Sequence, residues 1–564
     1  MTRADIRLGA AAIAVGVIMS VQSEFRLFLT TSAVITAILA RSVGFLYSDA
    51  RMVSLCQVSL AGIGGWTVGW FALHTRVPVE VALVLGGIAA VPIGVLVGLP
   101  ALRLRGVDLA VVTLGLAAAI QITVFNRGFP GERDNFLAPR PSIAASELRF
   151  LWFTLLVALV LELGLRALRR QAVGTSWAMV GQSERTTAAA GRSIILTKLT
   201  AFAVSALVAG IAGGLLALQV GRVSARQLEP IDSLVIFALI VMAGAAGALG
   251  AAIAGTFSAW IPELLRMLGW SQDIGPLVFA VGAAHVLSQD SDGIAGQWIA
   301  LASKFRRRRH APSSNRRETH KCQRPSSRNS SLVVRDLTVD YGSVRAVGGV
   351  SIDIAPGQVV GLIGANGAGK SSLVDAVTGY LSATEGTVHL GSRPLHSLTA
   401  HQRARAGLAR TFQRERTPTR LSVDSYLAVA ARRRTTMEQR DWLLAQFDLP
   451  DSRTRIAQLD SAARRKLELV AALCSVPAVA LLDEPAAGLT DTESKRLGSA
   501  LTCVAGEWGI GLLIIEHDLR LIRDVCETVV VLDQGQSIAA GPTAPTLASE
   551  QVVASYLGIE PKVT

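Results

Sequence analysis

The sequence has 564 residues, of which 51% are hydrophobic and only 17% are charged, and its formal net charge is +13. This length predicts at least two domains, and the apolar excess excludes a chain that is soluble throughout. Long apolar runs fill residues 1–303, whereas residues 331–564 have ordinary polarity. We therefore predict a transmembrane domain at 1–303 and a soluble domain at 331–564.

Ten apolar segments of the first domain approach the length of about 20 residues that a membrane-spanning helix needs. Arginine and lysine residues cluster in the short loops near 103–105, 166–170 and 185–198, which places these loops in the cytoplasm. With an even number of spans, both ends of the domain then face the cytoplasm. The predicted spans are 8–22, 27–47, 53–73, 79–101, 109–125, 149–166, 197–220, 231–247, 249–268 and 275–290.

Two ionisable side chains, Glu162 and His285, lie in or near these spans. Charged groups are costly in a bilayer, so each is a hypothesis for contact with a transported solute. A structural role is the alternative for both. Glu162 is close to the cytoplasmic end of its span, where its carboxylate could also reach the membrane surface.

Residues 176–199, between the sixth and seventh predicted spans, form a helix-prone insertion in which the helix is expected to end at Gly191. Its position on the cytoplasmic side makes it the best candidate for a rigid element that connects the membrane domain to the soluble domain. An ordinary amphipathic connector is the alternative.

Four stretches of the first domain resemble the permease of branched-chain amino acid ABC importers. They read SLCQVSLAGIGGW (54–66), GLPALRLRGVDLAVVTLG (98–115), KLTAFAVSALVAGIAGGLLA (198–217) and a run at 244–266 that ends in IPELLR. The likeness covers nearly all of residues 27–290. The chain departs from the family at Cys56, where glycine is usual, and at Asp108, where an aromatic residue is common. The external loop at 126–148 also lacks the glycine-rich motif of that family.

Residues 304–330 connect the two domains and hold ten lysine and arginine residues against one glutamate. Their Ser, Pro, Asn and Arg content argues against a packed core and predicts a basic flexible linker. Such a run could bind nucleic acid. Its place next to the membrane favours anionic lipid head groups instead, so we expect membrane lipid and no nucleic acid as its partner.

The soluble domain contains the stretch GLIGANGAGKSSL at 361–373, with a short β-type run before it and helical spacing after it. Glycines at this spacing let backbone N–H groups converge on phosphate oxygens at a helix N-terminus, and the lysine adds a positive charge. The pattern predicts a nucleotide-binding loop. The expected ATP contacts are Gly364, Ala365, Asn366, Gly367, Ala368, Gly369, Lys370, Ser371 and Ser372.

Four companion features accompany this loop in a fixed order. Tyr341 can stack its ring on adenine, and Gln413 can offer an amide oxygen to Mg²⁺ or orient water. An apolar strand at 478–485 ends in Asp483, a Mg²⁺ ligand, and Glu484, which polarises the attacking water. A second apolar strand at 511–518 delivers His517 beside the γ-phosphate. Ser371, Gln413 and Asp483 are therefore the expected metal ligands.

These motifs in this order resemble the ATP-binding cassette over residues 331–564, and EHDLRLIRDVCETVVVLDQGQSIAAGPT (516–543) resembles the cassette that accompanies branched-chain amino acid permeases. The resemblance implies a multi-span α-helical membrane domain of about ten helices fused to an α/β P-loop ATPase. It also implies ATP and Mg²⁺ as cofactors and a prokaryotic cytoplasmic membrane as location. The implied partners are a second permease, a second ABC ATPase subunit and an extracytoplasmic substrate-binding protein.

One segment departs from the cassette pattern. Where these ATPases carry an LSGGQ-type signature that touches the γ-phosphate on a partner cassette, this chain reads Leu459, Asp460, Ser461, Ala462 and Ala463. An aspartate about 5 Å from that phosphate would be repelled by about 3 kcal/mol per unit charge at an effective dielectric constant near 20. Asp460 or Ser461 could still cap the following helix. We predict an intact fold with a degenerate signature, whose ATP turnover depends on a heterologous partner cassette.

The sequence therefore predicts the fused permease–ATPase subunit of an ABC importer for branched-chain amino acids. Two alternatives remain open. The cargo could be urea or a short amide, because related permeases carry them. From a different class, the chain could be a regulatory ABC subunit that does not hydrolyse ATP, which the altered signature favours and the intact catalytic residues oppose.

Overall fold

The computed structural model describes residues 3–128, 130, 138–221, 228–272, 274–289, 293–306, 325, 329–413 and 417–557. The chain divides into two compact units, residues 1–177 with 195–313 and residues 178–194 with 314–564. The insertion that separates two membrane helices is thus grouped with the soluble unit. The predicted linker at 304–330 and the external loop at 126–148 lie partly outside the described residues.

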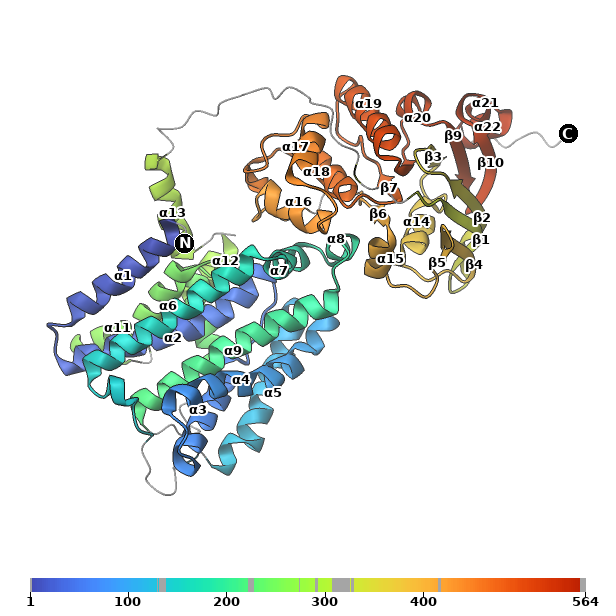
Figure 1. Ribbon diagram of the computed structural model, residues 1–564. Helices are drawn as coiled ribbons and strands as arrows, with labels where there is room; N and C mark the ends of the chain where they lie inside the picture. Colours follow the sequence, from blue (N-terminus) through green and yellow to red (C-terminus); the bar gives the residue numbers. More distant parts are fainter. Residues whose placement is uncertain are drawn as a thin grey trace. The chain divides into compact units, whose positions relative to one another are not determined.

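The first unit is a bundle of helices (Figure 1). Each of the ten predicted apolar segments is occupied by a helix. Within the described residues, six helices are long and apolar enough to cross a membrane: α2, α4, α5, α6, α9 and α11. The helices are α1 Arg3–Met19, α2 Glu24–Asp49, α3 Gln57–His74, α4 Val79–Gly98, α5 Gly106–Thr123, α6 Glu147–Arg170, α7 Ala172–Gln182, α9 Ile194–Val220, α10 Asp232–Ala243, α11 Ala248–Met267, α12 Ile274–Ser288 and α13 Gly293–Arg306.

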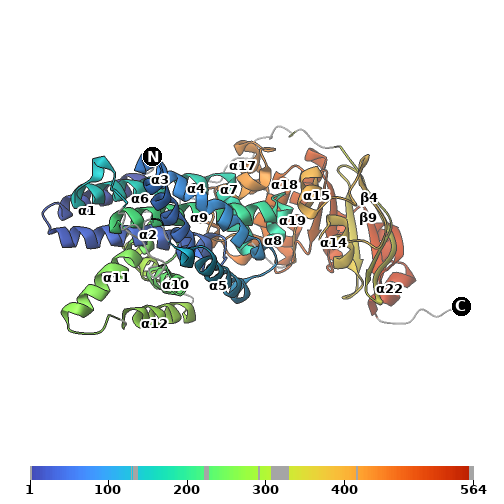
Figure 2. The same cartoon turned by 90° about the horizontal axis from the view of Figure 1, so that it is seen from below.

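Small residues let the helices of this bundle approach closely. A Cβ atom at Gly213 of α9 would collide with the carbonyl of Ala61 in α3, and one at Gly64 would collide with the carbonyl of Gly210. The glycine-rich runs of both helices therefore serve backbone-to-backbone packing, as is common in membrane bundles. In both views α2 lies along α6 (Figures 1 and 2), and Figure 2 shows α10, α11 and α12 together at one side of the bundle.

The second unit contains two β-sheets. The larger has the order β10-β9-β3-β8-β7-β6 and is parallel except for the antiparallel edge strand β10. Its inner strands β3, β7 and β8 are buried along their whole length, which is typical of a parallel sheet covered on both faces. Its strands are β3 Val359–Gly364, β6 Leu408–Arg410, β7 Val479–Asp483, β8 Gly511–Ile515, β9 Thr528–Asp533 and β10 Gln536–Pro542.

The smaller sheet is antiparallel with the order β2-β1-β4-β5, and one apolar core joins it to α14 and the larger sheet. Its strands are β1 Leu332–Tyr341, β2 Val344–Ile354, β4 Glu385–Leu390 and β5 Arg393–Pro394. The helices of this unit are α8 Glu184–Ala189, α14 Lys370–Thr378, α15 Ala400–Ala406, α16 Val423–Ala431, α17 Met437–Gln446, α18 Ser461–Cys474, α19 Asp491–Trp508, α20 Leu519–Val525, α21 Thr543–Leu547 and α22 Glu550–Leu557. The predicted α/β P-loop fold is confirmed, and its ligand site is expected at the carboxyl ends of the parallel strands.

Candidate functional site

The loop between β3 and α14 is shaped to receive phosphate oxygens. Gly364, Gly367 and Gly369 have positive φ angles of 155°, 86° and 93°, which residues with a side chain rarely adopt. A Cβ atom at Gly369 would also collide with the carbonyl oxygen of Ala346. Backbone N–H groups can therefore converge at the N-terminus of α14, where the helix dipole favours an anion. The other predicted ATP contacts in this loop and first helical turn are Ala365, Asn366, Ala368, Lys370, Ser371 and Ser372.

Lys370 begins α14 and reaches back over the loop. Its ammonium group donates to the carbonyl oxygens of Gly364, at 2.7 Å, and Ala365, at 2.8 Å. Burial lowers the pKa of Lys370, while the nearby Glu484 and Asp483 carboxylates oppose that shift. A partly buried ammonium held at a phosphate-binding loop is suited to neutralise phosphate charge.

Strand β7 brings two adjacent carboxylates to the end of the sheet. Asp483 is buried, and its backbone N–H donates to Oγ1 of Thr411 at 3.0 Å. Glu484 leaves the strand with a φ of 46°, and its N–H donates to the carbonyl of Ile515 in β8 at 2.9 Å. Burial raises the pKa of Asp483, and the positive charge of Arg410 opposes the shift. The two side chains therefore sit in different surroundings, although they are neighbours in sequence.

Three predicted catalytic side chains meet at this edge. Nε2 of Gln413 donates to Oε1 of Glu484 at 3.0 Å, and Nδ1 of His517 lies 3.9 Å from the same oxygen. The His517 side chain is 67% exposed, so it can face a ligand at the mouth of the site. Sequence reasoning missed the buried neighbour Glu516, whose carboxylate accepts the N–H of Ala486 at 2.9 Å and whose pKa is raised by burial.

Tyr341 lies at the end of β1, opposite Val344 of β2, and is 52% exposed. Ala346 of the same hairpin is the residue against which Gly369 packs. The hairpin that carries Tyr341 therefore adjoins the phosphate-binding loop, and an exposed ring there is available for stacking. The contact of this ring with adenine stays a prediction.

A buried arginine of α18 ties two of the catalytic segments together. The guanidinium of Arg465 donates to the carbonyl oxygens of Phe412 (2.9 Å), Gln413, Asp483 (3.0 Å) and Glu484 (2.7 Å). One planar group thus fixes the ends of β6 and β7, from which the Gln413 and Glu484 side chains project. Sequence reasoning missed Arg465 as well, because it lies in an arginine- and lysine-rich run that has the composition of a solvated helix face.

Comparison with known proteins identifies both units. The model described as the permease component of branched-chain amino acid transport systems matches residues 25–282, and the model described as ABC transporter matches residues 347–487. The high-affinity branched-chain amino acid transport ATP-binding protein BraF of Pseudomonas aeruginosa is 31% identical over an alignment of 248 residues, and the match covers 40% of this chain and 97% of that protein. The chain belongs to the branched-chain amino acid ABC transporter family.

Other relatives of this ABC transporter chain have different names. The protein LivG of Salmonella typhimurium, also named for branched-chain amino acid transport, is 32% identical over 40% of this chain and 97% of its own length. LptB of Haemophilus influenzae, named for lipopolysaccharide export, is 32% identical over 41% of this chain and 98% of its own length. A solved ABC cassette in its ADP conformation is 25% identical and covers 41% of this chain and 99% of its own, with a TM-score of 0.37. The second unit of the chain is an ABC ATPase domain that binds ATP.

The segment predicted to be a degenerate signature, residues 459–463, leads into α18. Leu459 is buried, and Asp460 is the N-cap, with its Oδ1 accepting the N–H of Ala463 at 2.7 Å. Ser461 is the first helical residue and Ala462 the second. The sequence allowed either Asp460 or Ser461 as the N-cap of this helix, and the structure shows that Asp460 is the cap. Its negative charge is therefore already placed at the N–H groups that begin the helix.

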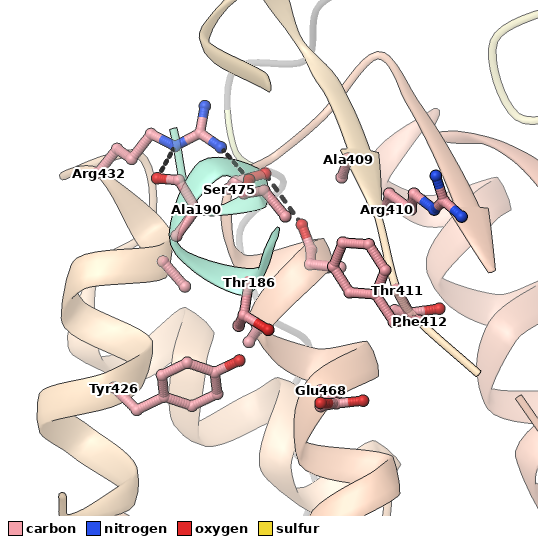
Figure 3. Close-up of a pocket in the computed structure, with 14 residues that line it drawn as sticks. Thr186, Ala190, Ala409, Arg410, Thr411, Phe412, Tyr426, Arg432, Glu468 and Ser475 are labelled. Carbon is pink, nitrogen blue, oxygen red and sulfur yellow. Dashed lines mark hydrogen bonds between the residues drawn. The ribbon is translucent and has the colours of Figure 1, made fainter. Parts of the chain in front are cut away.

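The insertion of the transporter at 178–194 is docked on its ATPase domain. Nε of Arg432 donates to the carbonyl of Ala190 and its Nη2 to that of Ala189, both at 3.0 Å (Figure 3). Nε of Arg405 donates to the carbonyl of Gly191 at 2.8 Å. Cations are favourable at a helix C-terminus, so two cassette arginines hold the end of α8. This agrees with the prediction that the insertion contacts the soluble domain.

A cavity of about 30 Å³ lies beside α8 within this unit. Thr186 of α8, Tyr426 of α16 and Glu468 of α18 face it (Figure 3). It has room for about one water molecule, so α8 is packed closely against the helices that carry the signature segment.

The intramembrane glutamate of the transporter is part of an ion-pair cluster. Oε2 of Glu162 accepts from Nε of Arg41 and its Oε1 from Nε of Arg166, both at 2.9 Å. Both Nη atoms of Arg41 are buried without a hydrogen-bond partner in the described part of the chain. Glu162 is therefore buried and paired, so the interpretation that it reaches the membrane surface is wrong. His285 is exposed on α12.

Arg41 and Glu162 line a cavity of about 280 Å³ between α1, α2, α6 and α11. Most of its wall is aliphatic or small, with Thr30, Thr256 and Trp260 as further polar or aromatic members. The size is close to the lower range of small-molecule sites.

Proposed function

We propose that this protein is the fused permease–ATPase subunit of an ABC importer that carries branched-chain amino acids across a prokaryotic cytoplasmic membrane. The observation that carries the proposal is the union in one chain of a permease-type helical unit and a cassette whose Gln413, Glu484 and His517 meet. The permease match favours import. The cassette alone does not, because it is about as similar to an export ATPase as to amino acid transport ATPases.

The residues of the cassette fit ATP with Mg²⁺. Ser371, Gln413 and Asp483 offer hydroxyl, amide and carboxylate oxygens, the hard donors that Mg²⁺ prefers. The amide nitrogen of Gln413 donates a hydrogen bond to Glu484, so the amide oxygen of Gln413 is the atom available to a metal. When bound, Mg²⁺ neutralises charge on the transferred phosphate. Glu484 then polarises the attacking water, and His517 contacts the γ-phosphate.

The cavity beside Arg41 supports an amphiphilic cargo. A branched-chain amino acid combines a carboxylate, which suits the guanidinium whose two Nη atoms have no partner in the described residues, with an aliphatic side chain that suits the walls. Urea or a short amide, the second candidate cargo, has no carboxylate for the guanidinium and at most a small alkyl group for the walls. The cavity is therefore our candidate for the amino acid site.

The degenerate signature supports a heterologous partner cassette. The Asp460 carboxylate, which already caps α18, would face a γ-phosphate with like charge. In a homodimer both ATP sites would contain this defect, whereas with an intact partner only one site would. We propose a complex with a second permease, a second ABC ATPase and an extracytoplasmic binding protein, while the basic linker at 304–330 contacts anionic lipid. The alternative is a regulatory subunit that does not hydrolyse ATP.

The first test is ATP turnover and leucine uptake by the complex, co-purified with its partner subunits in lipid, with wild type and Glu484→Gln. We expect the variant to lose both activities, because this chain would supply the catalytic glutamate of the ATP site that hydrolyses ATP. Unchanged turnover would favour the regulatory alternative. Uptake of labelled urea that leucine does not inhibit would overturn the proposed cargo.

The cargo site has its own test. Arg41→Met should raise the leucine concentration for half-maximal uptake by about tenfold or more, because a charge-assisted contact contributes about 1.5–3 kcal/mol. Arg149→Met is the matched control, since Arg149 is an exposed arginine of α6. Equal half-maximal concentrations in both variants would exclude Arg41 from the site.

A further inference from the structure

The first half of α8 meets the cassette at one carboxylate and one ring. Nη1 of Arg185 lies 3.6 Å from Oδ2 of Asp375 in α14, and its guanidinium lies 5.6 Å from the centre of the Tyr380 ring. The hydroxyl of Tyr380 donates to the backbone carbonyl of Arg185 at 2.7 Å. Arg185 is thus bound through both its side chain and its backbone, and half of its side chain stays exposed.

The other carboxylate oxygen of Asp375 accepts a hydrogen bond from a buried arginine. Nη1 of Arg410 donates to Oδ1 of Asp375 and to Oγ1 of Thr378 at 3.0 Å. Its guanidinium also lies 5.5 Å from the ring centre of Tyr380 and 5.0 Å from that of Phe412. The two acceptors and the two rings together set the position of this planar cation.

The same guanidinium ends close to the metal-ligand candidate. Nη2 of Arg410 lies 3.9 Å from Oδ2 of Asp483, at the limit of an ion pair and beyond hydrogen-bond distance. Asp375 and Asp483 therefore compete for one buried cation, and in this structure Asp375 holds it more closely. A guanidinium that moved fully onto Asp483 would occupy the carboxylate that a divalent cation needs.

We propose that Arg185, Asp375 and Arg410 form a relay through which α8 controls how readily Asp483 accepts Mg²⁺. Arg185 shares the Asp375 carboxylate, which weakens the hold of Asp375 on Arg410 and lets Arg410 move toward Asp483. Withdrawal of Arg185 returns the whole carboxylate to Arg410 and frees Asp483 for the metal. The proposal rests on the Mg²⁺ role of Asp483 given under Proposed function. It makes Arg410 a positioning residue and links the cytoplasmic insertion to the ATP site.

The relay predicts opposite effects at its two ends. Arg185→Gln should lower the divalent-cation concentration for half-saturation, and Asp375→Asn should raise it, because Arg410 would then pair with Asp483 alone. Perturbing a coupled network changes binding by about 2- to 30-fold. In the double variant, Arg185→Gln should have no further effect, since its path runs through Asp375. A merely structural role would impair both variants in the same direction.

The experiment uses the complete complex in lipid and two readouts. Mn²⁺ binding in the presence of ATP is followed by electron paramagnetic resonance in a Glu484→Gln background, and the Mg²⁺ dependence of ATP turnover is measured in chains that retain Glu484. Binding of metal-free ATP should not change. The exposed pair Arg335 and Asp353 of the antiparallel sheet supplies the controls Arg335→Gln and Asp353→Asn, which should leave both readouts unchanged.

Shifts of the same sign in the two relay variants, or additive shifts in the double variant, would overturn the proposal. If Asp375→Asn fails to assemble, Arg185→Gln alone decides, because the relay requires a lower half-saturating Mn²⁺ concentration. Asp483→Asn separates this inference from the proposed function. If Mn²⁺ affinity survives that change, the metal role of Asp483 is wrong, whatever the relay variants show.

Discussion

Replacement of Arg465 by methionine should disable the ATP site from a distance. The side chain is buried and donates to four backbone carbonyls, two on the segment that carries Gln413 and two on the segment that carries Glu484. The four bonds share one group, so their contributions do not add. A buried carbonyl oxygen that loses its donor costs about 1–3 kcal/mol. The freed segments would also no longer hold Gln413 and Glu484 in hydrogen-bond contact, and a misplacement of about 1 Å can lower the rate by about 100-fold.

The assay combines ATP turnover with thermal unfolding of the complete complex in lipid, at temperatures where every variant is folded. Arg496→Met is the matched control, because the Arg496 side chain on α19 is 68% exposed and its ion pair with Asp448 spans 3.7 Å. Arg465→Lys should recover part of the stability and little of the turnover, since one ammonium cannot reproduce the planar fork. If folded Arg465→Met turned over ATP within about twofold of the control, far inside the expected 100-fold loss, Arg465 would have no part in holding the site.

Three further changes test separate parts of the cassette. Gly369→Ala should weaken ATP binding by about tenfold or more, measured by nucleotide titration, because a φ of 93° is strained for alanine by about 1–3 kcal/mol and its Cβ would strike Ala346. Asp460→Ser with Ala462→Gly should raise ATP turnover of the complex by removing the repulsion at the second site; no change would show that the signature segment is not limiting. Burial raises the pKa of Glu516, so the stability that its protonated form contributes is lost as pH rises through that pKa. Glu516→Gln should therefore flatten the loss of thermal stability above the ordinary glutamate range, and an unchanged pH profile would contradict the assignment.

The nucleotide-binding elements could be predicted because their residues must stand at fixed places in strand–loop–helix units. The glycines of residues 364–369 adopt backbone angles that other residues avoid, and Asp483 and His517 come at the ends of continuous apolar runs that are typical of buried parallel strands. The apolar segments of the first unit were equally visible, since hydropathy and length decide them. The N-cap of α18 depends on one local hydrogen bond, so the sequence could limit it to two residues. The structure identifies Asp460 as the cap.

The residues that the sequence did not reveal depend on partners far along the chain. Arg41 and Glu162 are 121 positions apart, so neither the ion pair nor the cavity beside it has a local signal. The sequence alone does not distinguish the buried Arg465 from the arginine before it. The difference appears only when α18 is placed against β6 and β7. Asp375 could not be singled out from the sequence either. Its carboxylate lies on a short helix, and the two arginines that pair with it come from distant segments of the chain.

Helix α18 connects the intact and the degenerate parts of the cassette. Its N-cap is Asp460, whose carboxylate accepts an N–H group of the first helical turn and, in our proposal, would repel the phosphate of a partner nucleotide at that terminus. One turn later it carries Arg465, which holds this chain's own catalytic segments. An aspartate at the N-cap stabilises a helix at least as well as the serine that is usual in LSGGQ-type signatures. In the heterologous complex that we propose, Asp460 would therefore impair only the ATP site on the partner cassette, while it preserves the helix that carries Arg465.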